Sequence, residues 1–229
     1  MRIKASQGLL AAAAAVSLVL AMYGSLLWAP TEATMGDIQR IFYIHVPSAW
    51  TAFLAFFGVF VGSVAYLFTK NLKWDRIALS FAEIGLVFTT AVLITGPIWA
   101  KPVWGIWWTW DARLTTTLVL WLLYIAYLLL RDFMEEPPRR ASLAAVFGIF
   151  AFVDVPIVWA SIRIWRTQHP QPVIGGGEGS GLDPQMMNVL LFTWLSFLIL
   201  FALLAILRVR LAKAQEEVRE LRRKIMLHS

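Results

Sequence analysis

The sequence predicts an all-α membrane protein with six transmembrane helices, and two observations carry this prediction. Of its 229 residues, 59% are hydrophobic and only 15% are charged, and its mean hydropathy is +0.69. A water-soluble domain is about a quarter charged. The charged residues also leave six long apolar gaps of about 17–25 residues, the length that a helix needs to cross a bilayer. This composition excludes a soluble enzyme and a disordered tail, and the lack of cysteine excludes a disulfide-stapled secreted domain.

The six expected spans have apolar cores at residues 8–29, 46–69, 77–100, 114–130, 141–162 and 184–207. For the first, a cleaved signal peptide is the alternative, because basic residues precede an apolar run. We favour a signal-anchor helix, since the run continues to Trp28 and five further spans follow.

A single acidic residue interrupts the third span and another interrupts the fifth, and an ionised group inside a span is a functional candidate by default. We assign Glu83, in the third span, to a partner contact or an interhelical bond. Asp154 in the fifth span shortly precedes Pro156, whose missing N–H frees a backbone carbonyl. We therefore expect a kink there, below the outer end of the bundle.

The basic residues predict how the chain is oriented. With six spans, both termini lie on one side of the membrane, and the segments on that side hold 15 of the 20 Lys and Arg residues. By the positive-inside rule, the termini are cytoplasmic and the loops at 30–45, 101–113 and 163–183 face outward. The net charge of +6 is therefore a topology signal and does not indicate nucleic-acid binding.

We divide the chain into a six-span membrane domain, residues 1–207, and a cytoplasmic tail, residues 208–229. Leu211, Val218 and Ile225 recur in the tail at seven-residue spacing, which predicts a short amphipathic helix. Such a helix could lie against anionic headgroups or contact a partner helix, and both alternatives stay open.

Two of the three histidines fall in outer loops. His45 precedes the second span in RIFYIHVPSAW, and His169 follows the fifth span in RIWRTQHPQPV. His228 lies at the end of the tail, and we treat it as incidental. A lone interfacial histidine is more often a water or headgroup contact than a ligand, but two on the same side favour a ligand pair.

Tryptophan is concentrated in the outer segment 99–115. Five of the twelve tryptophans lie within twelve residues: Trp99, Trp104, Trp107, Trp108 and Trp110. If the segment is helical from Trp104, then Trp104, Trp107, Trp108 and Asp111 share one face and form an indole platform. An aromatic belt is the alternative, but a belt distributes single residues over many helix ends. From its position before the fourth span, we expect Asp111 to cap that helix or to anchor a loop hydrogen bond, rather than to contact a ligand.

Haem suits this set of side chains. Its flat ring stacks on indoles, its iron takes an imidazole from each face, and its propionates pair with guanidinium groups. Two histidines on one iron must bring their coordinating nitrogens to within roughly 4 Å of each other. Arg113 and Arg166 are our candidate propionate partners among the five basic residues of the outer loops, with Arg40, Lys101 and Arg163 the others.

The run WGIWWTWDARLT, from Trp104 to Thr115, resembles the "WWD" signature of haem-handling proteins in cytochrome c biogenesis. Together with HVPSAW before it, a histidine in the last outer loop and six spans, it most resembles the family of cytochrome c maturation protein C, or haem exporter protein C. The likeness covers almost the whole chain. Larger members of the WWD family carry more spans and more histidines.

The resemblance implies roles for particular residues. His45 and His169 would be the axial ligands of haem b (iron protoporphyrin IX) at the periplasmic face of a bacterial inner membrane. A platform would hold this haem and dock a periplasmic haem chaperone, and its members would be Trp104, Trp107, Trp108, Trp110 and Asp111. The implied partners are the membrane subunit and ATPase of an ABC transporter and a small single-span protein.

We therefore expect a protein that binds haem outside the membrane and delivers it to a chaperone for cytochrome c biogenesis, without being an enzyme itself. No nucleotide-binding loop, nucleophile triad or carboxylate pair occurs in the sequence. One rival is a membrane b-type cytochrome or quinol oxidoreductase, which predicts histidine pairs at mid-span. Another is a secondary transporter, which predicts broken helices and polar groups at the midplane.

Overall fold

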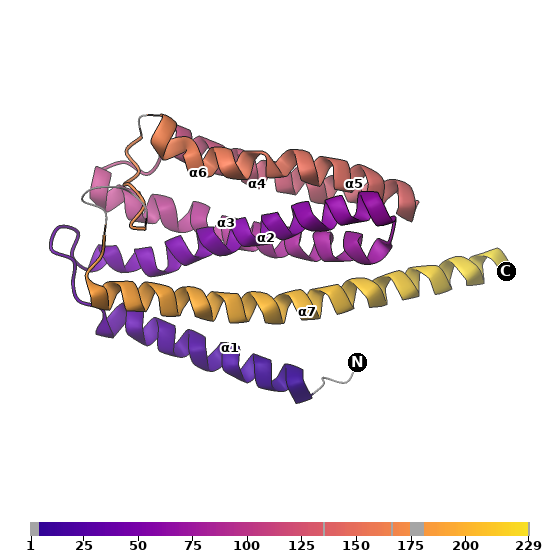
Figure 1. Cartoon of the computed structure of the whole chain (residues 1–229), viewed down its shortest axis with the longest axis horizontal. Coiled ribbons are helices and arrows are strands. Elements are labelled where there is room, and N and C mark those ends of the chain that lie inside the picture. Colours follow the sequence, from indigo (N-terminus) through magenta and orange to yellow (C-terminus); the bar gives the residue numbers. More distant parts are fainter. Residues whose placement is uncertain (1–4, 135, 166, 175–180, 229) are drawn as a thin grey trace.

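The computed structural model describes residues 5–134, 136–165, 167–174 and 181–228, and this part of the chain is a bundle of long helices (Figure 1). Six of its helical segments are long and apolar enough to cross a membrane, which confirms the six predicted spans. The elements are α1 (Ala5–Tyr23), the π-helical turn η1 (Gly24–Trp28), the 3₁₀ turn η2 (Asp37–Ile41), α2 (Phe42–Thr69), α3 (Leu72–Trp104), α4 (Ala112–Asp132), α5 (Pro137–Phe152), α6 (Asp154–Ile164) and α7 (Pro184–His228).

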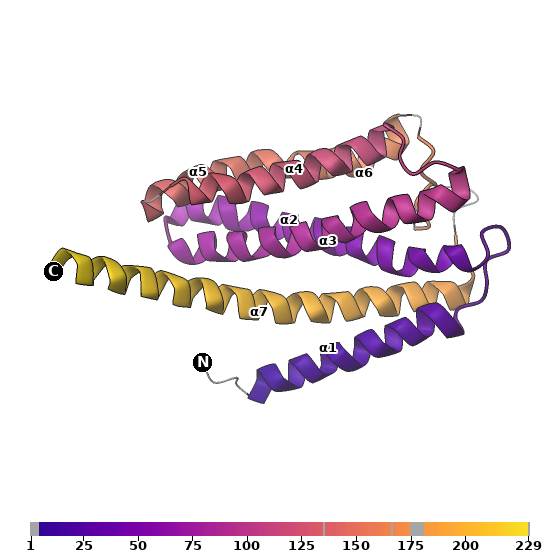
Figure 2. The same ribbon diagram turned by 180° about the vertical axis from the view of Figure 1, so that it is seen from behind.

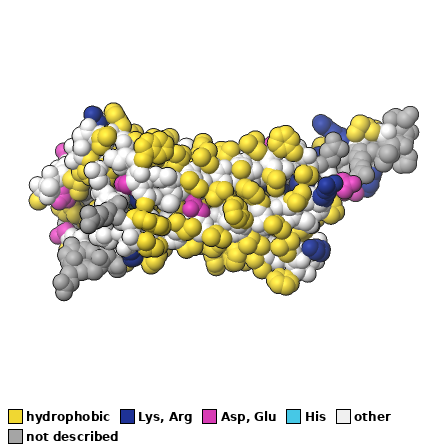
Figure 3. Space-filling model, turned by 90° about the horizontal axis from the view of Figure 1, so that it is seen from above, with side chains coloured by type: hydrophobic (Ala, Val, Ile, Leu, Met, Phe, Trp, Pro, Cys, Tyr) yellow, Lys and Arg dark blue, Asp and Glu magenta, His cyan; other side chains and the backbone are white. Residues whose placement is uncertain are grey.

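The helices run roughly along one axis, with α7 lying between α1 and the α2–α6 group (Figures 1 and 2). Both termini lie at one end of the bundle, as six spans require. The described parts of the three loops predicted to face outward lie together at the other end. The face seen in Figure 3 is covered by apolar side chains over the middle of the molecule, as expected of a surface that faces lipid.

The helices α2 and α3 approach closely because small residues lie between them. A Cβ added to Gly85 of α3 would lie 2.5 Å from Phe56 of α2. Phe56 is fully buried and stacks on Tyr124 of α4 at 3.7 Å between ring centroids. This contact joins α2, α3 and α4 into one core below the outer loops.

The second span begins earlier than predicted. The helix α2 already includes His45, which therefore lies one turn inside the helix and not in the loop before it. Pro47 follows within the helix, and His45 is only 9% exposed. The helical backbone thus directs the His45 side chain into the bundle.

The conditional prediction of a helix through the tryptophan segment is wrong. Gly105 ends α3 in the left-handed conformation, with φ of 75°, and its N–H donates to the carbonyl of Lys101. The next helix begins only after Asp111, whose carboxylate accepts a hydrogen bond from the N–H of Leu114 at 3.0 Å. Asp111 is therefore the cap that the sequence predicted, but Trp107, Trp108 and Trp110 lie in a non-helical loop.

Both acidic residues within the spans occupy the places predicted for them. Glu83 forms an ion pair with Arg208 of α7, which confirms the interhelical bond. Asp154 begins α6 immediately after a break at Val153, and Pro156 follows it. The fifth span is thus divided into two helices at Val153, the place where the sequence predicts a kink.

The tail is helical, but it is not a separate helix. The helix α7 runs from Pro184 to His228 without a break, and its last turns extend beyond the bundle (Figure 1). Glu216 binds Arg76 at the base of α3 at 2.7 Å. The side chains of the seven-residue repeat are exposed: Leu211, Val218 and Ile225 are 47%, 49% and 68% exposed.

Candidate functional site

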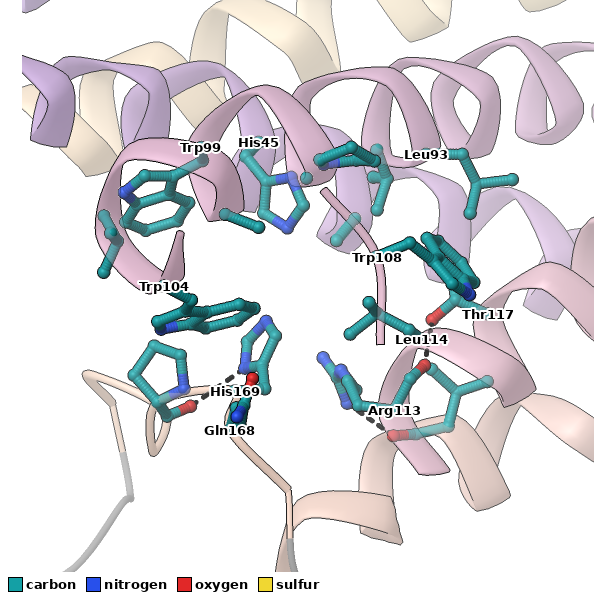
Figure 4. Close-up of a pocket in the computed structure, with 18 of the residues that line it drawn as sticks. His45, Leu93, Trp99, Trp104, Trp108, Arg113, Leu114, Thr117, Gln168 and His169 are labelled. Carbon is teal, nitrogen blue, oxygen red and sulfur yellow. Dashed lines mark hydrogen bonds between the residues drawn. The ribbon is translucent and has the colours of Figure 1, made fainter. Parts of the chain in front are cut away.

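A cavity of about 390 Å³ opens at the end of the bundle where the outer loops gather (Figure 4). Its wall includes parts of α2, α3, α4 and α6, the loop that follows α6, and residues 105–111 between α3 and α4, which we call the tryptophan loop. Five of the predicted site residues line it: His45, Trp104, Trp108, Arg113 and His169. Segments far apart in the sequence therefore meet here, and the volume lies in the range of small-molecule sites, about 300–1,000 Å³.

The two outer histidines face each other across this cavity (Figure 4). Their ring centroids are 6.5 Å apart and their planes are tilted by 34°. Two metal–imidazole bonds of about 2 Å, with about 1 Å from each nitrogen to its ring centroid, give a separation of roughly 6 Å for two ligands of one ion. The observed distance between the centroids fits a pair of axial ligands.

Each imidazole has one nitrogen engaged with the protein. His45 Nδ1 is 2.9 Å from Thr95 Oγ1, and His169 Nδ1 donates to the carbonyl of Pro170 at 3.0 Å. Burial and the nearby Arg113 guanidinium lower the pKa of His169 to about 4. His169 is therefore neutral at physiological pH, which is the form that ligates a metal.

The tryptophans of segment 99–115 divide between two environments. Trp104 and Trp108 line the cavity (Figure 4). Trp107 and Trp110 are 56% and 75% exposed and do not line it. The single indole face expected from a helix is thus replaced by an inner pair and an outer pair.

The polar residues of the predicted site also lie in different places relative to the cavity. Arg113 lines the cavity, and its guanidinium donates to the backbone carbonyl of Val158 in α6. Asp111 lies outside the cavity wall, where it caps α4 and accepts from the hydroxyl of Thr109. Arg166 lies outside the described residues.

The structure adds residues that sequence analysis did not assign to the site. Trp99 lines the cavity and packs edge-on against His45 at 5.8 Å between ring centroids. Thr95, which is hydrogen-bonded to His45, lies one helical turn before Trp99, so the two residues lie on the same face of α3. Gln168 and Glu32 also contribute to the wall, from two different outer loops. Neither belongs to a motif that could have identified it.

These residues suit a planar metal complex better than a bare ion. Among the described residues, no group of three or more His, Cys, Asp or Glu side chains is placed to hold a metal ion. Two opposed imidazoles leave the remaining positions around an ion unfilled, and a porphyrin supplies four nitrogens there. The apolar wall with its inner indoles, and one guanidinium at the side, fit the ring and a propionate.

The chain is similar to known proteins over nearly its whole length. The family described as "Heme exporter protein C" matches residues 3–224. The chain belongs to this family. Both histidines and the whole tryptophan segment fall inside the matched region, so family membership covers every residue of the candidate site.

Relatives in the family come from distant sources. Heme exporter protein C of Bradyrhizobium diazoefficiens is 34% identical over 212 residues, which are 93% of this chain and 80% of the relative. That of Escherichia coli K12 is 34% identical over 211 residues, with 88% and 81% covered. A protein of Marchantia polymorpha, named a putative cytochrome c biosynthesis ccmC-like mitochondrial protein, is 34% identical over 191 residues, with 83% and 81% covered.

Proposed function

We propose that this protein binds haem at the outer face of the bacterial inner membrane and delivers it for cytochrome c biogenesis. The observation that carries the proposal is the pair of imidazoles facing each other across a cavity at a ligand-pair distance. Family membership supports haem as the cargo, and the name of the Marchantia relative supports the pathway.

Different residues around the cavity would hold different parts of haem. His45 and His169 supply the axial nitrogens, one from a helix and one from a loop. Trp104 and Trp108 offer aromatic faces to the porphyrin, and Arg113 offers a cation to a propionate. Because one ligand comes from a loop, haem can be released when that loop moves away from α2 without disturbing the bundle.

The outer tryptophans would serve the transfer step. Trp107 and Trp110 are large, exposed aromatic residues, and such residues are enriched in protein-binding surfaces. Both are also close to the cavity wall. We assign them to docking of a periplasmic haem chaperone. The membrane subunit and ATPase of an ABC transporter and a small single-span protein complete the proposed set of partners, with the termini of this chain in the cytoplasm.

The two rival functions fit the structure less well. A b-type cytochrome that carries electrons across the bilayer needs histidines at mid-span, but His45 lies in the first turn of α2 and His169 in the loop after α6. A secondary transporter needs a central polar site, whereas the cavity lies at the loop end and most of its wall is apolar.

The test is the optical spectrum of the purified protein. We expect bound haem with a six-coordinate low-spin spectrum, and loss of that haem in the double variant His45→Ala/His169→Ala. Each single variant should shift the spectrum toward high spin, because one axial ligand is lost. His228→Ala is the matched control, since it removes the remaining histidine and should leave the spectrum unchanged.

If the double variant retains haem in the same amount and with the same spectrum, the axial assignment is wrong. A wild-type protein that takes up no haem in any preparation would contradict the proposed function as a whole.

A further inference from the structure

A chain of hydrogen bonds connects the backbone of α3 to one of the two imidazoles. Thr95 Oγ1 donates to the carbonyl of Ala91 at 2.7 Å, one turn earlier in the helix. The same oxygen lies 2.9 Å from His45 Nδ1. Both distances are those of ordinary hydrogen bonds.

The direction of the second bond follows from the first. A threonine hydroxyl carries a single hydrogen and two lone pairs. With its hydrogen directed to the Ala91 carbonyl, Thr95 can only accept from the imidazole, so His45 Nδ1 carries a proton. In a neutral imidazole the lone pair then lies on Nε2.

We propose that Thr95 is a positioning residue that holds His45 in the tautomer whose Nε2 can bind iron. This inference rests on the proposed function, because it concerns how the site is prepared for haem. Fixing the tautomer before haem arrives removes a rearrangement from the binding step, and the hydrogen bond to Nδ1–H makes the ligating nitrogen more basic.

A glycine on α3 lets the His45 ring come close to Thr95. The next residue is Gly96, and a Cβ added there would lie 3.4 Å from His45 Cε1. The ring thus lies directly against the α3 backbone, and Trp99 of the same helix packs edge-on against it. This packing leaves Nε2 as the nitrogen available to the cavity.

The Nδ1 of the second histidine also has a hydrogen-bond partner, but this partner is a backbone carbonyl. His169 Nδ1 faces the carbonyl of Pro170, and a carbonyl can only accept. Both imidazoles are therefore held as the Nε2 ligand, one by a side chain and one by the backbone. Of these two partners, only the side chain of Thr95 can be removed by substitution.

The first experiment reads the tautomer directly, without haem. Protein labelled with ¹⁵N-histidine contains only three imidazoles, and His45→Ala identifies the signals of His45 in a nitrogen NMR spectrum at mildly alkaline pH. We expect a protonated Nδ1 and a lone pair on Nε2 in the wild type. In Thr95→Val, we expect a mixture of tautomers, and in Thr95→Ser, the wild-type pattern. A wild-type tautomer with the proton on Nε2 would overturn the proposal, as would an unchanged pattern in Thr95→Val.

The second experiment measures the effect on haem. Loss of such a supporting hydrogen bond costs about 10–100-fold in metal affinity, so Thr95→Val should weaken haem binding by that factor and Thr95→Ser should restore it. Thr116→Val is the matched control: its hydroxyl also bonds the carbonyls three and four residues earlier, but it contacts no histidine. Equal haem affinity in Thr95→Val and Thr116→Val would overturn the inference.

These outcomes are separable from a failure of the proposed function. If the wild type binds haem and Thr95→Val changes neither the tautomer nor the affinity, the function stands and the role of Thr95 does not. If the wild type binds no haem, the proposed function fails, and the NMR spectrum still decides whether Thr95 sets the tautomer.

Discussion

Arg131 of α4 and Asp75 of α3 form an ion pair inside the bundle, far from the cavity. The guanidinium donates two hydrogen bonds to the carboxylate, at 2.5 and 2.7 Å, and the two side chains are only 6% and 3% exposed. The guanidinium also contacts the hydroxyl of Tyr127. Such a pair is costly to break, because removing one partner leaves the other charge buried.

We expect Arg131→Met to lower the free energy of unfolding by about 3–5 kcal/mol, because Asp75 is left buried without its partner. The double variant Arg131→Met/Asp75→Leu should recover much of this loss, since it buries no charge. Denaturant titration of the purified protein in detergent measures both. A single variant as stable as the wild type would show that the pair is solvated.

The two outer-loop histidines could be identified from the sequence, but the groups that hydrogen-bond to their imidazoles could not. Only three histidines occur, so the two in outer loops were easy to single out. Thr95 is one of many threonines in apolar segments, and its role depends on which residue of α2 lies opposite it. That pairing is set by helix packing, and no local pattern encodes it.

The tryptophan segment shows how one glycine changes an element. Spacing alone put Trp104, Trp107, Trp108 and Asp111 on one face, but Gly105 stops the helix before most of them. Residues 105–111 then form a loop, and a loop has no fixed period. Consequently Trp108 lines the cavity while Trp107 and Trp110 lie exposed.

We expect this division to separate two activities. Trp104→Ala/Trp108→Ala should weaken haem retention on the order of tenfold or more, because each aromatic contact contributes about 0.5–1.5 kcal/mol beyond buried area. Trp107→Ala/Trp110→Ala should leave haem retention near that of the wild type and slow transfer to the chaperone. Haem content after gel filtration and a transfer assay measure the two effects.

The reverse result would restore the single-platform interpretation. If loss of the exposed pair depletes haem as strongly as loss of the inner pair, then all four indoles contact the ring in the loaded state.

For the whole molecule, the structure places both termini at one end and the cavity at the other. Orientation in the membrane then follows from charge, since most basic residues belong to the segments at the terminal end. This arrangement puts the cavity and the exposed tryptophans on the same outer side. In the proposed orientation, haem held in the cavity would be accessible to a periplasmic acceptor.

The absence of cysteine makes this orientation testable. Ile106 lies in the tryptophan loop and is 46% exposed, and Phe133 lies just after α4 at the opposite end and is 81% exposed. In spheroplasts, a membrane-impermeant maleimide should label Ile106→Cys and should label Phe133→Cys only after lysis. Labelling in the opposite order would invert the proposed topology.

Composition and charge by themselves determined the six spans and the grouping of most basic residues on one side of them, and they singled out the outer segments that we propose as the source of the ligands. These properties are local or additive, because bilayer thickness sets the length of an apolar run and each charge contributes separately to orientation. Only the tertiary structure decided that His45 and His169 meet at 6.5 Å, that the indoles divide into two pairs, and that Thr95 bonds His45. Those contacts join residues from different helices and loops, and they depend on helix packing, which hydrophobicity around each span leaves unspecified.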